Sequence, residues 1–362
     1  MAKGVKVNTA YDSAMTVLHA NLAALADPLA DPEVLEIMVN RHDNVWIERG
    51  GAMQHVALDL PATAVRNALK ALASLNHKEV RPIMDTRVQS GRLGLRIAAA
   101  MHPIAVHGDM LCIRKHTHSL RRLTQYLHQG AFEPMEDVPR RSRAEDIERP
   151  PDEAVEEGGA SVLEFLRWAI LARKNCIISG GTSSGKTTFM NALLAEVEPS
   201  RRVLTIEDTA ELQITLPNHV SLEANEDLGV ATRDLVKLAL RCRPDSVILG
   251  EGRDGRTAFD ILDAANTGHS GCAVTLHADS AKLALARFEN LIRMAPEAAN
   301  WPLSALRAQI ATTFQFVIHT SRRFGERGPD EIIEVLGTAA NGAYRTRVLF
   351  SRLRQTQEDP QP

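Results

Sequence analysis

The residues from Gly180 to Thr187 have the types and spacing of a phosphate-binding loop, G-x(4)-G-K-T. Glycines let backbone N–H groups turn inward around a phosphate, and the N-terminus of a following helix adds a positive dipole end. Lys186 supplies a point charge for the β- and γ-phosphates of ATP, and the Thr187 hydroxyl is placed to coordinate Mg²⁺. The predicted contacts to the nucleotide in this region are Gly180, Gly181, Thr182, Ser183, Ser184, Gly185, Lys186, Thr187 and Thr188.

The segments on either side of the loop support this interpretation. Residues 176–179 before it form a short apolar run typical of a buried strand, and residues 187–197 after it have a helical pattern. A chance match on a Gly/Ser-rich turn would not be expected to carry both flanks. The sequence therefore predicts ATP and Mg²⁺ as cofactors.

Two later apolar runs end in carboxylates, one at Glu207 and the other at Glu251, which follows Gly250. The first acid cluster alone is also compatible with a solvated turn, but carboxylates at the C-terminal ends of parallel strands face the ligand crevice. We therefore predict that Glu207 orients or deprotonates the attacking water. Gly250 stands where many P-loop enzymes have a Mg²⁺-binding Asp, so the predicted metal ligands are Thr187, water and Glu251.

A histidine follows a third apolar run. His277 comes directly after residues 273–276, and an isolated histidine is usually only a satisfied polar group. At a strand end beside the same crevice it is better placed to contact the γ-phosphate and to sense hydrolysis. The predicted catalytic residues are Lys186, Glu207, Glu251 and His277.

The elements that position these residues begin at Ser161. Ser161 and Glu164 read as a capping box that opens an amphipathic helix. Apolar runs at 176–179, 203–206, 247–249 and 273–276 then alternate with helical patterns. This alternation predicts an α/β fold with a mostly parallel sheet covered on both faces, over residues 161–354, followed by a disordered tail at 355–362.

The first 132 residues read as a smaller α+β domain. Residues 133–160 are rich in charge, Pro and Gly, and we expect a flexible linker that lets this domain pack on its own motor domain or on a neighbouring one. The predicted helices of the first domain are 9–25 and 61–75, and its predicted strands are 34–39, 45–48, 56–60, 93–99 and 110–114.

Composition excludes several classes of protein. The net charge of -3 gives no whole-chain electrostatic reason to expect nucleic acid or a membrane surface as the main partner. No run approaches the ~18 apolar residues of a membrane span, and the N-terminus has no signal-peptide core, so we expect a cytoplasmic protein. The four cysteines form no C-x-x-C pair, which indicates buried thiols rather than a zinc or disulfide site.

Four ordered motifs resemble those of the secretion ATPase superfamily, which powers type II secretion, type IV pili and type IV secretion. They are the P-loop, the acidic segment 206–208, the segment 241–251 and the segment 268–278. Residues 241–245 and the first domain with its segment 34–40 are most similar to the traffic ATPases of conjugation and type IV secretion. The absence of a four-cysteine zinc module argues against the type II and pilus-extension branches, and the pilus-retraction branch remains the alternative.

The resemblance implies a RecA-like motor domain in a homohexameric ring, with the nucleotide held between the two domains. Arginines of the first domain reach the phosphates in such ATPases, and Arg96 and Arg114 match that pattern. Ser183 departs from the pattern, because relatives often have Gly at its position. The implied partners are inner-membrane channel components, a coupling protein and a second secretion ATPase, with transferred DNA or protein engaged indirectly at the cytoplasmic face of the inner membrane.

Three other functions remain to be separated from this one. A small-molecule kinase also uses a P-loop and Mg²⁺ but needs an acceptor pocket. A nucleotide-gated scaffold would assemble without turnover, which Glu207 and Glu251 make less expected. A nucleic-acid motor would show ATP turnover stimulated by DNA with steep salt dependence.

Overall fold

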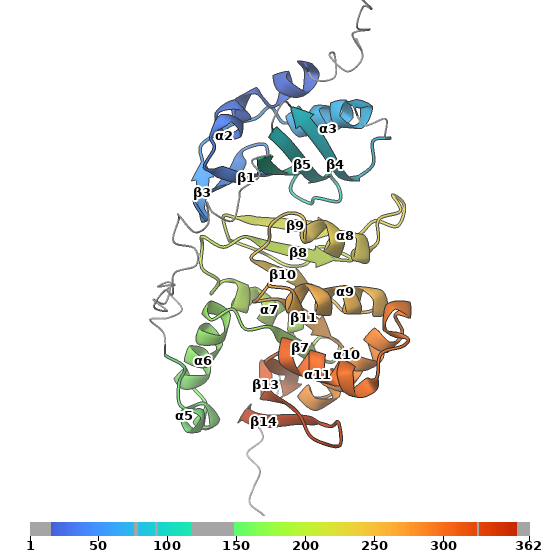
Figure 1. The fold of residues 1–362 in the computed structure, drawn as a ribbon. Coiled ribbons are helices and arrows are strands. Elements are labelled where there is room, and N and C mark those ends of the chain that lie inside the picture. Colours follow the sequence, from blue (N-terminus) through green and yellow to red (C-terminus); the bar gives the residue numbers. More distant parts are fainter. Residues whose placement is uncertain (1–15, 76–78, 91–92, 118–147, 324–325, 353–362) are drawn as a thin grey trace, which may run out of the picture. The chain divides into compact units, whose positions relative to one another are not determined.

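The computed structural model describes residues 16–75, 79–90, 93–117, 148–323 and 326–352, and the chain divides into two compact units, residues 1–145 and 146–362 (Figure 1). Residues 9–15 of the first predicted helix, 133–147 of the predicted linker and the predicted tail lie outside the described residues.

The first unit is built on a six-stranded sheet with the order β3-β2-β1-β6-β5-β4, in which all neighbours are antiparallel. Its helices bury Leu69 and Leu72 of α3 together with Ile37, Ile97 and Ile113 of the sheet, so one sheet face carries the core. The elements are a helical segment at 16–21, η1 (Ala23–Leu25), α2 (Ala26–Ala30), β1 (Val34–Arg41), β2 (Asn44–Arg49), β3 (Ala52–Val56), α3 (Ala64–Leu75), β4 (Ile83–Ser90), β5 (Leu93–Ala100) and β6 (Met110–Thr117).

The third strand lies earlier in the sequence than expected. Residues 57–60, which we predicted as strand, are irregular, and β3 ends at Val56. The reason is the tight turn at Gly50 and Gly51, whose φ angles of 57° and 83° suit a two-residue hairpin. Pairing therefore starts at once, with Arg49 opposite Ala52. The strand β4 was not predicted.

The second unit contains an eight-stranded sheet with the order β14-β13-β12-β7-β11-β10-β8-β9 (Figure 1). Neighbours from β12 to β9 are parallel, whereas β13 and β14 form antiparallel pairs at one edge. The prediction of a mostly parallel sheet is confirmed. The strands are β7 (Cys176–Gly180), β8 (Val203–Glu207), β9 (His219–Glu223), β10 (Ser246–Leu249), β11 (Ala273–Leu276), β12 (Phe316–Arg323), β13 (Glu326–Thr338) and β14 (Tyr344–Ser351).

Helices cover both faces of this sheet. Phe165 of α6 and Met190 of α7 pack with Ile178, Ile248 and Phe316 on one face. The helices α8 to α10 contact the strands from the other face (Figure 1). The helices of this unit are α5 (Asp152–Glu157), α6 (Ala160–Leu171), α7 (Lys186–Leu194), α8 (Thr232–Ala239), α9 (Gly255–Asn266), α10 (Ala281–Arg293), η2 (Pro296–Ala298) and α11 (Leu303–Thr313).

The entry into α6 differs from the predicted capping box. The helix begins at Ala160, one residue before Ser161, and its N-cap Gly159 makes no side-chain cap. Gly158 and Gly159 have φ angles of 91° and 67°, so they turn the chain sharply out of α5 into α6. Glycine geometry rather than a serine hydroxyl therefore starts this helix.

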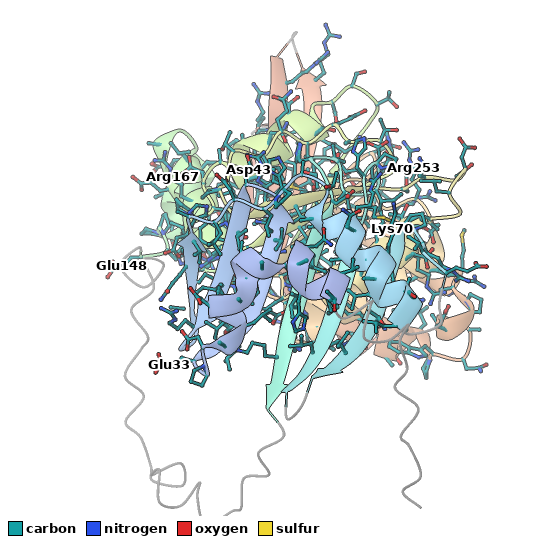
Figure 2. The ribbon with its side chains drawn as sticks, turned by 90° about the horizontal axis from the view of Figure 1, so that it is seen from above. Glu33, Asp43, Lys70, Glu148, Arg167 and Arg253 are labelled. Atoms are coloured by element: carbon teal, nitrogen blue, oxygen red, sulfur yellow. The ribbon has the colours of Figure 1, made fainter. Side chains whose placement is uncertain are left out.

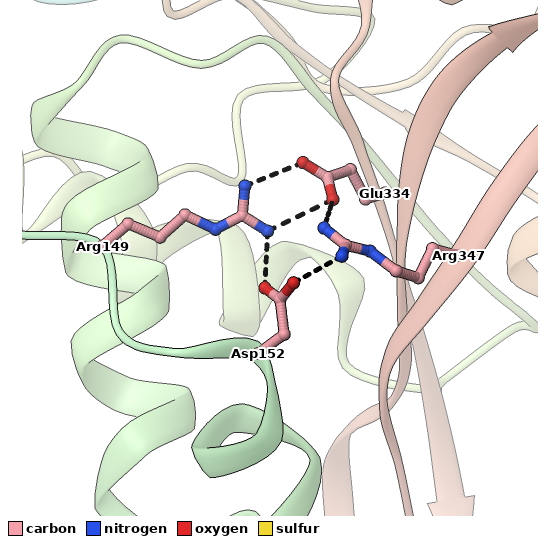
Figure 3. Close-up of polar contacts among 4 residues, drawn as sticks. All are labelled: Arg149, Asp152, Glu334 and Arg347. Atoms are coloured by element: carbon pink, nitrogen blue, oxygen red, sulfur yellow. Dashed lines mark hydrogen bonds and ion pairs between the residues drawn. The ribbon is translucent and has the colours of Figure 1, made fainter.

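The helix α5 lies inside the segment that we expected to be linker, so that expectation is wrong for residues 152–157. Val155 is fully buried, and Asp152 and Glu153 stand in the first turn, where acidic groups are favourable. Figure 3 shows how this segment is fixed to β13 and β14: Arg149 and Arg347 each contact both Asp152 and Glu334.

Charged side chains lie on the surface, and the cysteines lie in the interior. Charged side chains such as Lys70, Arg167 and Arg253 are exposed (Figure 2). All four cysteines are free and buried, as the sequence predicted, and burial raises the pKa of Cys176 to about 12. Among the described residues, no helix is both long enough and apolar enough to cross a membrane.

Candidate nucleotide-binding site

A pocket of about 490 Å³ lies where the loop after β7 meets the C-terminal ends of β8, β10 and β11. This volume is in the range of small-molecule sites. Predicted residues Thr182 to Thr188, Glu207, Glu251 and His277 all line it, whereas Gly180 and Gly181 begin the loop without lining it. The complete lining is Thr182, Ser183, Ser184, Gly185, Lys186, Thr187, Thr188, Glu207, Asp208, Thr209, Glu211, Gly250, Glu251, Arg253, Thr275, His277 and Arg327.

The loop has the backbone of an anion cradle. A Cβ atom at Gly180 would lie 2.3 Å from the Ser184 Oγ and 2.4 Å from the Thr320 carbonyl oxygen, so only glycine fits there. Ser183 and Gly185 have φ angles of 58° and 92°, both in the left-handed region. The turn delivers the chain into α7, whose first N–H groups lack intrahelical acceptors and suit an anion.

The ammonium group of Lys186 lies across the start of this loop. Its Nζ donates to the carbonyl oxygens of Gly180 at 3.0 Å and Gly181 at 2.9 Å. Burial lowers the pKa of Lys186, and the nearby Glu251 carboxylate opposes that shift. The lysine is therefore held at the mouth of the cradle by neutral acceptors, which a phosphate oxygen can replace.

Strand β12 supports the loop from the side opposite β11. The Thr320 Oγ1 lies 3.0 Å from the Ser184 Oγ and donates to the Ser179 carbonyl oxygen at 3.0 Å. The His319 Nδ1 lies 3.0 Å from the Ser179 Oγ, and all four side chains are buried. Sequence reasoning missed His319 and Thr320, although they follow the apolar residues 316–318 as the predicted site residues follow theirs.

Glu207 is buried at the end of β8 and faces the pocket. Its Oε1 accepts hydrogen bonds from the N–H groups of Glu211 at 3.0 Å and Leu212 at 3.1 Å. Burial raises the pKa of Glu207 above its ordinary value, although these two hydrogen bonds oppose the shift. A Cβ atom at Gly250 would lie 2.6 Å from the Glu207 Cγ, which explains why a larger residue does not occupy that position.

Glu251 is paired with two neighbours at the ends of β10 and β11. Its Oε1 lies 3.0 Å from the His277 Nε2, and its Oε2 accepts from the Arg253 Nη2 at 2.6 Å. Burial would raise the pKa of Glu251, but Arg253, His277 and Lys186 together lower it. The carboxylate is therefore ionised at neutral pH. The Arg253 Nη1 also lies 3.7 Å from the Asp208 Oδ2. Neither residue was predicted as a site residue, although Asp208 follows Glu207 directly and Arg253 lies two residues after Glu251.

The donor set limits how a metal would be held. Within the described residues there is no cluster of three or more His, Cys, Asp or Glu side chains that would suit a metal ion. Among the oxygen-bearing side chains that line the pocket, the hydroxyl of Thr187 and the carboxylate of Glu251 are the two predicted ligands. So few protein ligands fit Mg²⁺, which usually keeps several waters and binds through one or two protein groups and substrate phosphates.

Arg96 and Arg114 belong to the first unit, whereas all the pocket residues belong to the second. The two arginines are opposite one another on β5 and β6. The Arg96 Nε lies 3.4 Å from Asp85, and the Arg114 Nε lies 3.2 Å from the buried carboxylate of Glu36. Their contact with phosphates stays a prediction.

The sequence is similar to known secretion and conjugation proteins. A model of the family described as type II/IV secretion system protein matches residues 154–333. The chain is 31% identical over 338 residues to the type IV secretion system protein PtlH homolog of Bordetella bronchiseptica, covering 91% of this chain and 97% of that protein. It is 32% identical over 328 residues to the conjugal transfer protein TrbB of Rhizobium radiobacter, covering 88% of each.

The fold is similar to a solved structure. The crystal structure of the VirB11 ATPase from the Brucella suis type IV secretion system, in complex with sulphate, matches with a TM-score of 0.78 and 26% sequence identity. The match covers 90% of this chain and 96% of that one. The similarity in sequence and the similarity in fold therefore both extend over most of the chain.

Proposed function

Because this chain belongs to the traffic ATPases of type IV secretion and conjugation, within the type II/IV secretion protein family, we propose that it hydrolyses ATP with Mg²⁺ in the pocket around Lys186. One observation carries this proposal: a phosphate-binding loop, two carboxylates at strand ends and His277 line the same pocket. Relatives named for type IV secretion and conjugal transfer favour this branch over a pilus-retraction motor.

The proposed chemistry uses the residues in distinct roles. Lys186 exchanges its bonds to the Gly180 and Gly181 carbonyls for oxygens of the β- and γ-phosphates. Glu207 accepts a proton from the water that attacks the γ-phosphorus, as the bond to the leaving ADP oxygen breaks. Its raised pKa makes Glu207 a stronger base than an exposed carboxylate.

Glu251 and His277 act as a pair on the γ-phosphate side of the pocket. Thr187 and Glu251 would hold Mg²⁺, which when bound would neutralise part of the phosphate charge. His277 donates to the γ-phosphate or to Glu251, depending on whether that phosphate is present. Loss of the phosphate therefore changes the hydrogen bonding at the ends of β10 and β11.

The larger assembly is part of the same proposal. We infer a RecA-like motor in a homohexameric ring at the cytoplasmic face of the inner membrane. Arg96 and Arg114 would bring the first unit onto the phosphates, and hydrolysis would release it. This two-state closure would drive transfer of DNA or protein through the channel components, a coupling protein and a second secretion ATPase. The proposed domains are residues 1–132 and a motor domain that ends at residue 354 and includes α5 before residue 161.

The test is the substitution Lys186→Ala, measured as phosphate release from ATP with Mg²⁺ and no added acceptor. We expect the variant to fall to the background rate, because it lacks the only lysine that lines the described pocket. Lys237→Ala is the matched control, since Lys237 is exposed on α8 and does not line the pocket. Wild-type turnover in the Lys186 variant would show that the site is assigned wrongly, and turnover that requires an acceptor would indicate a kinase.

A further inference from the structure

We propose that Arg327, on the hairpin formed by β12 and β13, is a nucleotide-binding residue that holds the α- and β-phosphates of ATP and of the product ADP. The inference rests on the proposed function of the pocket. It assigns a residue that the phosphate-loop motif does not contain, since Arg327 lies 140 positions after Thr187 in the sequence. Sheet topology alone brings it to the site.

The order of strands separates Arg327 from the catalytic carboxylates. On one side of β7 stand β11, β10 and β8, which carry His277, Glu251 and Glu207 at or just after their C-terminal ends. On the other side stand β12 and β13, of which β13 is labelled in Figure 1. Arg327 is the second residue of β13 and lines the pocket from this side. The two walls of the pocket therefore meet different parts of a bound nucleotide.

The stem of Arg327 lies beside the phosphate loop. A Cβ atom built on Gly185 would lie 3.4 Å from the Arg327 Cβ and 3.7 Å from its Cδ. In a loop of this type the backbone N–H groups cradle the α- and β-phosphates, whereas the lysine reaches the β- and γ-phosphates. A guanidinium whose stem passes Gly185 is thus directed to the part of the nucleotide that remains after hydrolysis.

The other cations of the pocket already have partners. Lys186 bonds to two carbonyl groups, and Arg253 bonds to Glu251 and faces Asp208. In the part of the chain that the structure describes, Arg327 is exposed and has no ion pair with a carboxylate. Its planar guanidinium can bind two phosphate oxygens at once, and no existing ion pair has to break first.

A residue with this role contributes equally to the binding of substrate and product. An interaction of equal strength in the ground state and the transition state alters KM without lowering kcat. Arg327 would therefore retain ADP after phosphate has left, and its removal would speed product release.

The experiment measures binding of ADP and of a non-hydrolysable ATP analogue to the full-length chain by calorimetry. For Arg327→Ala we expect both Kd values to rise by the same factor, about five- to tenfold, as for one partly solvated charged hydrogen bond. In steady state KM for ATP should rise while kcat stays unchanged or increases. Arg327→Lys should recover part of the affinity, because lysine keeps the positive charge but cannot donate two parallel hydrogen bonds as the guanidinium does.

The matched control is Arg322→Ala. Arg322 is opposite Arg327 across the hairpin, is equally exposed and does not line the pocket, so both Kd values should stay near those of the wild type. If Arg327→Ala binds like this control, or loses affinity for the triphosphate analogue alone, the inference is wrong while the proposed function stands. If the wild-type chain binds neither nucleotide, the proposed function fails and the inference fails with it.

Discussion

Gly250 and Glu207 show how one residue type depends on another in the pocket. A side chain at position 250 would collide with the Glu207 Cγ at 2.6 Å, so an aspartate there would require the buried Glu207 side chain to move. The site therefore has a glycine beside the buried Glu207, whose pKa is raised, and the carboxylate at the end of β10 comes one residue later, at Glu251. Ser183 also has a backbone cost, because a φ of 58° destabilises a non-glycine residue by about 1–2 kcal/mol.

The raised pKa of Glu207 predicts how turnover depends on pH. A general base works only when deprotonated, so activity should be lost as pH falls through the pKa of Glu207. Burial places this acid limb above 4.5, the ordinary pKa of a glutamate. We expect Glu207→Gln to lower the single-turnover rate about 10²- to 10⁴-fold and to remove the limb.

The measurement is the single-turnover rate of ATP cleavage between pH 5 and 8, with nucleotide affinity followed at each pH. Glu211→Gln is the control, because Glu211 also lines the pocket but is exposed. Its charge helps to raise the pKa of Glu207, so this variant should keep its rate and its acid limb, with the limb moved to lower pH. A Glu207→Gln variant that keeps both its rate and its acid limb would exclude Glu207 as the base.

The main chemical groups at the ends of predicted strands could be predicted from the sequence, whereas His319, Thr320 and Arg327 lie on β12 and β13, which were not predicted, and were missed. Lys186, Glu207, Glu251 and His277 each come shortly after a run that reads as a buried strand, so a parallel sheet brings them together. Arg327 reaches the pocket only because β12 pairs with β7 and β13 folds back on β12. Local sequence does not specify strand order, so nothing marked Arg327 in advance.

At the scale of elements, the same reasoning explains which strands were missed. The strand β4 carries polar residues at Asp85, Thr86 and Arg87 and lacks a clear apolar alternation. The edge strands β9 and β14 are partly exposed, which also weakens the pattern. The helix α5 is short and acidic, and it depends on tertiary contacts rather than on its own sequence.

The charge network in Figure 3 is one of the contacts that hold α5 in place, together with the buried Val155. Arg149 donates to Glu334 at 2.8 Å and to Asp152 at 2.8 Å, and its guanidinium lies 5.3 Å from the centre of the Trp168 ring. Burial would raise the pKa of Glu334, but the bonds from Arg149 and Arg347 lower it below its ordinary value. The network therefore joins the start of the second unit to β13 and β14.

This lowered pKa predicts a stability difference that depends on pH. A carboxyl with a depressed pKa in the folded state stabilises the protein above its unfolded pKa, near 4.5, and loses that contribution as pH falls through the folded pKa. At pH 7 we expect Glu334→Gln to lower the free energy of unfolding by about 1–2 kcal/mol. The difference from the wild type should shrink progressively below pH 4.5.

Urea unfolding of both proteins at several pH values measures this difference. Glu196→Gln serves as the control, because the pair of Glu196 with Arg167 is exposed on both sides and should contribute little at any pH. A stability difference for Glu334→Gln that stays constant from pH 7 to pH 3 would show that the charge of Glu334 is not what matters.

At the scale of the whole molecule, the pocket and the arginine pair belong to different units. Every residue that lines the pocket lies between 182 and 327, whereas Arg96 and Arg114 lie in the first unit. The proposed motor cycle requires these two sets of residues to meet on one nucleotide. The two arginines differ in how strongly their replacement would disturb the folded structure, and this decides which one can test the requirement.

Arg114 pairs with Glu36, whose side chain is only 2% exposed, so its removal would take a cation away from a buried carboxylate. Arg96 is 48% exposed, and its 3.4 Å contact with Asp85 is weak. Arg96→Ala is therefore the substitution that separates a catalytic role from a structural one. The melting temperature should stay close to that of the wild type.

If Arg96 neutralises phosphate charge during cleavage, Arg96→Ala should lower kcat/KM for ATP by roughly 10³-fold or more, as for other arginines that complete a phosphoryl-transfer site. Asp85→Asn leaves Arg96 in place while weakening its pair, so its turnover should remain near the wild-type value. Steady-state phosphate release from the assembled protein compares the three chains. Equal turnover in all of them would mean that the first unit acts on the motor without Arg96, and closure would then have to be sought through other contacts.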